Sequence, residues 1–450
     1  MTRLERLVGA IRSRGTAPCL HVDGTWHAYA DLVAALDRWR SRLEASGPRA
    51  GEVVGLQACY SLESLAFLLA AWQRRLVVAL IPPAPEPADR RLDDARAVGC
   101  FVISGADVQW LPRRAGSAAA PPLLEALRAR DVAGLVIFTS GTSGEPKAAL
   151  HDVDRFMGKY DRPGRALRTL ALLQFDHVAG VDTLLYTLSA GGALVVPPRP
   201  DPREVCATIA AARAEVLSAS PSFLRLLWAS GAAAEADLSS LRIITFGSEP
   251  MDAATLRRTA ALFPGVRLSQ KYGTTETGSP RTIPRGDDGL WIRLDQPGVE
   301  VEVRDRVLWI RSDGAFLGYL NAEAALDSDG WYCTGDLVEQ DGPWLRILGR
   351  RGTLINVGGE KVAPEHVETV ILELEGVVAA VVRGQPHPLL GEIVTAQVEL
   401  APGVDPAGLD ARVRRHCRER LARHEVPVIV DVAAAGALVN DRQKTVRRPP

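Results

Sequence analysis

A turn rich in glycine and hydroxyl groups follows an apolar run in LVIFTSGTSGEPKAAL, residues 135–150. Glycines let a backbone approach a polyphosphate and point amide N–H groups at it, while hydroxyl groups add donors and lysine adds a cation. The spacing is not that of a P-loop, because Glu145 and Pro146 separate the last glycine from the lysine. The segment predicts a phosphate-binding turn, with a flexible surface turn as the alternative. Its candidate ligands are Thr139, Ser140, Gly141, Thr142, Ser143, Gly144 and Lys147.

Two later segments combine the groups that a metal-bound nucleotide requires. In QKYGTTETG, residues 270–278, an aromatic ring can stack on a purine, a hydroxyl can reach a phosphate and a carboxylate can hold Mg²⁺. In GWYCTGDL, residues 330–337, an aspartate after a glycine turn can accept both ribose hydroxyls. Taken singly, a core tyrosine and a solvated acid would be the more ordinary interpretations.

In the same order along the chain, these segments resemble the signatures of the adenylate-forming superfamily. That superfamily comprises acyl-CoA and aryl-CoA synthetases, adenylation domains of nonribosomal peptide synthetases, and luciferases. The resemblance continues in GRRGTLINVGGEKVAPEHVE at 349–368 and RQKTVRR at 442–448, so it covers essentially the whole chain. It implies an α/β fold with a large N-terminal domain, 1–349, of layered parallel-rich sheets and helices with a small β element. A small mobile α+β C-terminal domain, 350–450, would follow.

The resemblance also implies roles for individual residues in binding ATP. Tyr272 would lie against adenine, Thr275 would meet phosphate and Glu276 would order Mg²⁺. Asp336 would bind the ribose, with Arg350 as its companion. Further residues of the nucleotide site would be Gly247, Ser248, Glu249, Gly273 and Thr274.

Lys444 would be the catalytic cation that bridges the substrate carboxylate and the α-phosphate. A compact ammonium suits that role, because charge spreads over the phosphoryl oxygens and the attacking carboxylate. The surroundings depart from the family pattern, since Gln443 replaces a glycine, but the spacing to Arg447 is kept. A frayed, solvated tail is the alternative. Only five of the 53 lysines and arginines are lysines, at positions 147, 159, 271, 361 and 444. Because most cationic positions are arginine, a lysine is a stronger indication of a functional role here than in an ordinary sequence.

The segment QFDHVAGVDTLLYTLSAGGALVV, residues 174–196, resembles the acid pocket of acyl- and aryl-CoA ligases. His177 would gate or wall that pocket, with a satisfied core histidine as the alternative. Asp176 is out of register with the aspartate that grips an amino-acid substrate, which disfavours a peptide-synthetase domain. We hypothesise that Asp182 meets an amino or hydroxyl substituent of an aromatic acid, with a solvent-facing helix end as the alternative. Other pocket residues would be Ala179, Gly180 and Val181.

The expected reaction is ATP-dependent activation of a carboxylic acid, aromatic or short acyl, as acyl-AMP with release of pyrophosphate. Transfer to a thiol would follow, with coenzyme A as the first choice and a carrier protein's phosphopantetheine arm as the second. Gly358, Gly359 and Lys361 resemble the strip that lines the tunnel for the thiol. Three alternatives stay open: a relative that uses an amine or nitrite, a phosphotransferase that releases ADP, and a degenerate nucleotide-binding scaffold.

Composition narrows the possible partners. The 53 basic and 54 acidic residues give a formal net charge of −1, which does not favour a nucleic-acid partner. The six cysteines lie far apart, which argues against a disulfide framework or a structural zinc site. Apolar runs are too short to span a membrane, and residues 1–15 lack a secretory pattern. We therefore expect a cytoplasmic protein with neither nucleic-acid nor membrane partners.

The elements that must position these groups follow from periodicity. Residues 31–46 predict a helix capped by Asp31, because leucines and a tryptophan recur at three- and four-residue spacing. Short strands are expected at 299–320, and a basic helix is expected from Arg412 to His424 after a helix beginning near Pro364. Apolar runs that alternate with helical stretches predict a mainly parallel sheet; they lie at 52–57, 76–81, 101–103, 135–139, 193–196 and 242–246.

Overall fold

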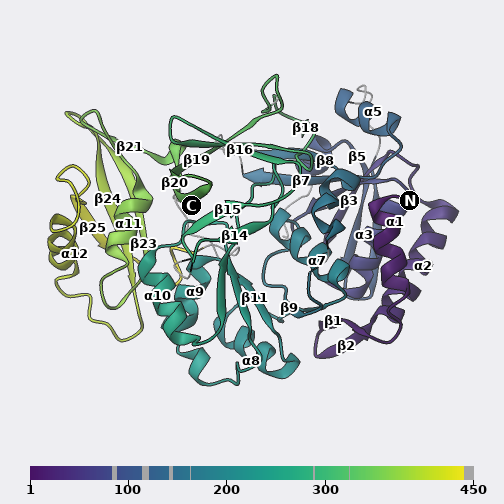
Figure 1. The fold of residues 1–450 in the computed structure, drawn as a ribbon, viewed down its shortest axis with the longest axis horizontal. Coiled ribbons are helices and arrows are strands. Elements are labelled where there is room, and N and C mark those ends of the chain that lie inside the picture. Colours follow the sequence, from purple (N-terminus) through teal and green to yellow (C-terminus); the bar gives the residue numbers. More distant parts are fainter. Residues whose placement is uncertain are drawn as a thin grey trace.

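The computed structural model describes residues 1–83, 89–113, 121–140, 145–162, 164–286, 289–323 and 325–439. Within these ranges the chain forms two seven-stranded sheets, a six-stranded sheet and a five-stranded sheet near the C-terminus (Figure 1). No helix in the same ranges combines the length and apolar character needed to cross a membrane.

The first sheet is parallel except at one edge, where β1 and β2 pair antiparallel. Its strands are short apolar runs separated by helices, as β-α-β units require. The predicted strands at 193–196 and 242–246 are confirmed as β10 and β12. In order across the sheet the strands are β13 (Arg267–Gln270), β12 (Ile243–Phe246), β11 (Val216–Ala219), β9 (Arg168–Leu170), β10 (Ala193–Val195), β1 (Pro18–Val22) and β2 (Thr25–Ala28).

The second sheet has a parallel centre with antiparallel strands at both edges. The predicted strands at 52–57, 76–81, 101–103 and 135–139 all lie in it. In order across the sheet the strands are β18 (Gly318–Tyr319), β8 (Pro146–Asp152), β7 (Gly134–Ser140), β4 (Val77–Ile81), β3 (Val53–Ala58), β5 (Ala97–Ser104) and β6 (Asp107–Pro112).

Helices fill the space between these two sheets and cover their outer faces. The largest apolar cluster joins both sheets to the inner helices α1 (Arg3–Arg12), α2 (Tyr29–Ser46), α3 (Leu62–Gln73) and α7 (Val178–Ala190). Outside the first sheet lie α8 (Pro202–Ala212), α9 (Pro221–Ala229) and α10 (Ala253–Leu262). Outside the second sheet lie α4 (Asp89–Asp94) and α5 (Pro122–Ala129). Short helical turns complete the set: α6 (Val153–Phe156), η1 (Met157–Asp161), η2 (Ala232–Ala234) and η3 (Arg351–Thr353).

The helix expected at 31–46 is confirmed as α2, but its start is corrected. It begins at Tyr29, which is fully buried, so Ala28 and not Asp31 is the N-cap residue. Asp31 lies in the first turn, where its carboxylate accepts a hydrogen bond from the Ala28 amide at 2.8 Å. A carboxylate at this position stabilises the exposed N–H groups of the helix start.

The third sheet is antiparallel and lies beside the first two. Its strands are β14 (Thr282–Pro284), β15 (Trp291–Leu294), β20 (Trp344–Arg350), β19 (Tyr332–Asp341), β17 (Val307–Ser312) and β16 (Val299–Arg304). The small β element predicted at 299–320 is thus only partly separate, because β18 pairs with β8 of the second sheet. Residues 318–319 therefore tie the third sheet to the strand that follows the predicted phosphate turn.

The C-terminal part of the chain has its own sheet and core, seen at one end of the molecule in Figure 1. Helices α11 (Pro364–Ile371) and α12 (Leu409–Arg418) pack on it. The basic helix predicted to reach His424 is shorter than expected, because a turn after the buried Cys417 returns Leu421 to the core. The strands are β22 (Glu360–Val362), β21 (Ile355–Val357), β24 (Gly391–Leu400), β23 (Val377–His387) and β25 (Ile429–Val432). The domain division at 349/350 falls at the end of β20 and stays a prediction.

Candidate active site

A cavity of about 2410 Å³ lies over one face of β11, β12 and β13. Side chains alternate between the two faces of a strand, so every second residue of these strands faces the cavity while the others pack under α8, α9 and α10. The cavity face carries Ser218, Thr245 and Ser269, which lie side by side in register on adjacent strands. We call these three residues the hydroxyl row. The rim is formed by α7, the β7–β8 hairpin and the third sheet.

The predicted phosphate turn connects β7 to β8 at the edge of this cavity. Thr139 pairs with Lys147 across the hairpin, and both residues line the cavity. The Lys147 ammonium lies 5.1 Å from the centre of the Tyr319 ring. Gly141, Thr142, Ser143 and Gly144 fall outside the described residues, as does the side chain of Ser140.

The segment after β13 folds into a tight turn that presents two predicted ligands. The Thr274 amide donates to the Gly278 carbonyl at 3.1 Å, and the Thr277 amide donates to Thr274 Oγ1 at 3.1 Å. A Cβ atom on Gly273 would lie 2.4 Å from the Gly278 carbonyl oxygen, so this close approach requires glycine. The cavity lining includes Gly273, Thr274, Thr275 and Glu276.

Glu276 is buried beside a tyrosine that the sequence did not single out. The Tyr319 hydroxyl donates to Glu276 Oε1 at 2.6 Å. Burial and the neighbouring Glu276 carboxylate raise the pKa of Tyr319 well above its usual value, so this hydroxyl stays protonated and able to donate. The described residues hold no cluster of three or more His, Cys, Asp or Glu side chains that could hold a metal ion by themselves. One carboxylate combined with phosphate oxygens is the donor set that Mg²⁺ takes in nucleotide sites.

Tyr272, Asp336 and Arg350 form a connected group between the first and third sheets. The Tyr272 hydroxyl donates to Asp336 Oδ2 at 2.7 Å, and Arg350 Nε donates to Oδ1 at 3.0 Å. Asp336 and Arg350 are direct partners in the β19–β20 pairing. Burial raises the pKa of Asp336, and the Arg350 charge opposes that increase. Tyr272 and Arg350 line the cavity, and Asp336 lies directly behind them.

The residues after β12 divide between the cavity and the protein interior. Gly247 and Ser248 line the cavity, and Ser248 has a positive φ of 66°. Glu249 does not line it, because its carboxylate accepts a hydrogen bond from the Ser222 hydroxyl at 2.7 Å at the start of α9. Glu249 is therefore held by α9, and its expected place in the nucleotide site stays a prediction.

One face of α7 forms the wall opposite the phosphate turn. His177 precedes the helix and lines the cavity together with Ala179 and Asp182. Gly180 and Val181 do not line it: a Cβ atom on Gly180 would meet the Gln174 carbonyl oxygen at 1.9 Å, and Val181 is fully buried in the core. The structure thus brings three of the five predicted acid-pocket residues to the cavity.

Two other predicted residues lie away from the cavity or outside the described part of the chain. Gly359 is in the turn between β21 and β22 of the C-terminal sheet and does not line the cavity. Lys444 falls outside the described residues. Their roles stay predictions.

Sequence reasoning missed several cavity residues, above all Lys159 and Lys271. Lys159, on η1, donates to Asp182 Oδ1 and to the Ser279 carbonyl, and the Tyr160 hydroxyl donates to the same Asp182 oxygen at 2.6 Å. Lys271 directly follows β13 and also lines the cavity. The rarity of lysine was a usable signal, because three of the four lysines in the described residues face this one cavity.

The overall fold is similar to that of proteins with solved structures. The solved structure of the anthranilate CoA ligase AuaEII in complex with anthranoyl-AMP has a TM-score of 0.83 at 20% sequence identity, and the match covers 99% of this chain and 95% of that one. At this identity the likeness shows the fold alone. It confirms the predicted α/β architecture with a large N-terminal part and a smaller C-terminal part.

Family models identify the chain more specifically. The model described as AMP-binding enzyme matches residues 9–320, and the model described as AMP-binding enzyme C-terminal domain matches residues 366–439. The chain therefore belongs to the AMP-binding enzyme family, which confirms the resemblance to the adenylate-forming superfamily.

Curated relatives include several CoA ligases. Indoleacetate–CoA ligase of Aromatoleum aromaticum is 31% identical in an alignment 354 positions long that covers 70% of this chain and 66% of that ligase. The 2-succinylbenzoate–CoA ligase of Geobacillus kaustophilus is 27% identical in an alignment 440 positions long that covers 89% of this chain and 87% of that ligase. The chain therefore spans just under two thirds of the length of the indoleacetate ligase in this match.

Proposed function

We propose that this protein activates a carboxylic acid with ATP as an acyl-adenylate, releases pyrophosphate, and transfers the acyl group to a thiol. The observation that carries this proposal is the convergence of four separate segments on one cavity. The phosphate hairpin, the 273–278 turn, the Tyr272–Asp336–Arg350 group and the face of α7 come from distant parts of the sequence. A nucleoside, its phosphates and a second small substrate can therefore be held side by side.

The nucleoside would bind at the Tyr272–Asp336–Arg350 group. Tyr272 offers an aromatic surface, and Asp336 offers carboxylate oxygens that can accept from ribose hydroxyls. Arg350 holds the Asp336 carboxylate in place from the neighbouring strand. This arrangement supports the roles proposed for all three residues.

The phosphates would lie between Thr139 and Lys147 on one side and Thr275 and Glu276 on the other. The two threonine hydroxyls can donate to phosphate oxygens, and Lys147 can compensate their charge. When bound, Mg²⁺ would neutralise charge on the phosphate oxygens, with Glu276 as its protein ligand and Tyr319 fixing that carboxylate. Positioning and charge compensation are the principal requirements for displacement at phosphorus.

The acid would lie along α7, with its carboxylate at the His177 end, where it can reach the α-phosphate. Lys444 would contribute its charge there while the acyl-adenylate forms. We propose coenzyme A as the thiol substrate, with a carrier protein's phosphopantetheine arm as the second choice. Both deliver the same thiol, and Gly359 would line its path.

An exchange assay tests this function directly. Purified protein, MgATP and radioactive pyrophosphate would be incubated with a panel of aromatic and short-chain acids, and label entering ATP would be measured. Acid-dependent exchange is expected, together with AMP and an acyl thioester when coenzyme A is added. Glu276→Gln, which keeps the side-chain size, serves as the inactive control. Release of ADP, or an amide product in place of a thioester, would contradict the proposal, as would a folded, ATP-binding protein that exchanges with no acid.

A further inference from the structure

Lys271 extends from the end of β13 over the same face as the hydroxyl row. It lies two residues beyond Ser269, so both side chains point into the cavity. Among the described residues no carboxylate lies within ion-pair distance of its ammonium; the recorded neighbour is the ring of Tyr186, whose centre is 5.9 Å away. Burial lowers the pKa of Lys271, and the nearby Lys159 charge lowers it further. A largely buried cation of this kind is costly unless a ligand supplies an acceptor.

The acid nearest to this region, Asp182, is already engaged. Lys159 and Tyr160 both donate to Asp182 Oδ1, which leaves that carboxylate neutralised by the lysine of η1. Lys159 also donates to the Ser279 carbonyl, so it bridges α7 to the turn after β13. The Asp182 charge is therefore balanced inside the protein, whereas the Lys271 ammonium faces the cavity without a carboxylate partner among the described residues.

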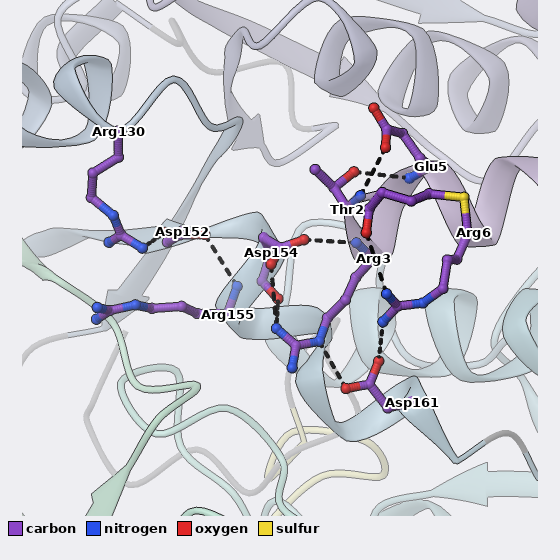
Figure 2. Close-up of polar contacts among 10 residues, drawn as sticks. Thr2, Arg3, Glu5, Arg6, Arg130, Asp152, Asp154, Arg155 and Asp161 are labelled. Atoms are coloured by element: carbon purple, nitrogen blue, oxygen red, sulfur yellow. Dashed lines mark hydrogen bonds and ion pairs between the residues drawn. The ribbon is translucent and has the colours of Figure 1, made fainter.

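The segment that carries Lys159 is held firmly by the N-terminal helix. Figure 2 shows Arg3 of α1 between Asp154 and Asp161, and Arg6 beside Asp161. Arg3 Nε donates to Asp161 Oδ2 at 2.9 Å, and the Arg3 amide donates to Asp154 Oδ1 at 2.8 Å. Arg6 Nη2 donates to Asp161 Oδ1 at 2.6 Å. Because the segment 154–161 is held at Asp154 and at Asp161, Lys159 is positioned to remain with Asp182 and not to move toward a ligand.

The remaining charged groups around Lys271 are also cationic. Arg267 and Arg281 line the same cavity, and each contributes to lowering the pKa of Lys271, while Asp182 opposes them. The Ser218 and Thr245 hydroxyls lie 2.8 Å apart in the cavity floor; Thr245 is one strand away from Ser269 and Ser218 is two strands away. Hydroxyl groups beside an ammonium are the donors that an anionic oxygen requires.

We propose that the acid substrate carries a second anionic oxygen group, which Lys271 and the hydroxyl row bind. This inference rests on the proposed function, because the first carboxylate is the one activated near the phosphates. Ala179 and Tyr186 are about two helical turns apart on α7, roughly 10 Å along its axis. That span matches an acid with its two acidic groups at opposite ends of an aromatic ring or of a short chain. The chemical class is thus a dicarboxylic acid or an acid bearing an ionised hydroxyl group.

Matched acids and a lysine variant test the proposal. The probes are benzoate, benzene-1,4-dicarboxylate, 4-hydroxybenzoate and 4-aminobenzoate, with hexanoate and adipate as the aliphatic pair. Binding of each acid is measured by calorimetry, and kcat/KM by pyrophosphate exchange. The doubly acidic probes should be preferred over the probes that carry only one acidic group. Lys271→Met should reduce that preference by about 10- to 100-fold, as expected for the loss of one charge-assisted hydrogen bond, and leave binding of the singly acidic probes nearly unchanged.

Two further variants separate a specific site from general effects. Thr245→Val should weaken the same preference by a smaller factor, and Arg40→Met, which removes an exposed charge from α2, should leave it unchanged. Comparing the affinities for benzene-1,4-dicarboxylate and 4-hydroxybenzoate shows whether Lys271 prefers a carboxylate or a hydroxyl as the second acidic group of the substrate. Equal losses for singly and doubly acidic probes in Lys271→Met would overturn the inference, and so would a preference for 4-aminobenzoate. A Lys271-dependent binding preference without any exchange would support the anion site and contradict the proposed function.

Discussion

The Tyr272 hydroxyl donates a hydrogen bond to Asp336 Oδ2 at 2.7 Å, and this contact joins the end of the first sheet to the third sheet. Arg350 donates to the other carboxylate oxygen, so Asp336 is oriented from two sides. A buried carboxylate held in this way presents its remaining lone pairs in a fixed direction. The contact explains how a residue behind the cavity wall can serve a ligand in front of it.

Asp336→Asn is expected to raise the KM for ATP by about 10- to 100-fold with a smaller effect on kcat, because an amide replaces a charged acceptor for ribose hydroxyls. Initial-rate kinetics of acid-dependent exchange at varied ATP would measure this. Tyr272→Phe, which removes only the supporting hydroxyl, should give a smaller increase. An unchanged KM in a folded Asp336→Asn protein would remove Asp336 from the nucleotide site.

Tyr319→Phe tests how Glu276 is positioned. Without the hydroxyl, Glu276 Oε1 loses its 2.6 Å donor and the carboxylate is less well oriented. We expect the Mg²⁺ concentration for half-maximal exchange to rise several-fold, because second-sphere partners typically contribute about 10- to 100-fold to metal affinity or activity. The measurement is a Mg²⁺ titration at fixed ATP. If Tyr319→Phe lowered the maximal rate at every Mg²⁺ concentration without shifting the midpoint, Tyr319 would have another role.

Lys444→Ala tests the proposed catalytic cation. Loss of one preorganised charge contact should reduce adenylation by about 10²–10³-fold while ATP binding largely persists. Exchange rates and equilibrium binding of ATP would be measured on the same preparation. Lys361→Ala offers a comparison in the C-terminal sheet, where a defect is expected in thioester formation but not in exchange. A wild-type exchange rate in Lys444→Ala would exclude the residue from the first half-reaction.

Motifs whose chemistry lies in consecutive residues could be predicted well from the sequence. The strand before the phosphate turn follows from a short apolar run. Arg350 as the companion of Asp336 was implied only by the resemblance to the adenylate-forming superfamily. Parallel strands were also predictable, because buried apolar runs between helices have few other arrangements.

Contacts between distant segments could not be predicted in the same way. Tyr319 reaches Glu276 only because β18 pairs with β8 of the second sheet, and Lys159 reaches Asp182 only because η1 packs against α7. Neither residue belongs to a local motif. Val181 shows the converse: it lies within the predicted pocket segment, but the period of α7 turns its side chain into the core.

The last prediction concerns His151, which is fully buried in β8 behind the cavity wall. Its ring lies 5.2 Å from that of Phe156, and burial lowers its pKa to about 4, with the Thr275 backbone opposing the shift. In the unfolded chain the pKa of a histidine is about 6.5. Between these values the unfolded state binds a proton that the folded state does not, so the free energy of unfolding falls as pH decreases from about 6.5 to 4.

His151 should therefore contribute a loss of about 2 kcal/mol in the free energy of unfolding between pH 7 and pH 5. His151→Leu replaces the titrating group with an apolar side chain. Its free energy of unfolding should therefore fall by about 2 kcal/mol less between pH 7 and pH 5 than that of the unchanged protein. Urea unfolding of both proteins at pH 7, 6 and 5 would measure the difference, in which the contributions of other acidic groups cancel. Parallel pH dependences for the two proteins would mean that His151 binds protons equally in the folded and unfolded states, which would contradict a pKa lowered by burial.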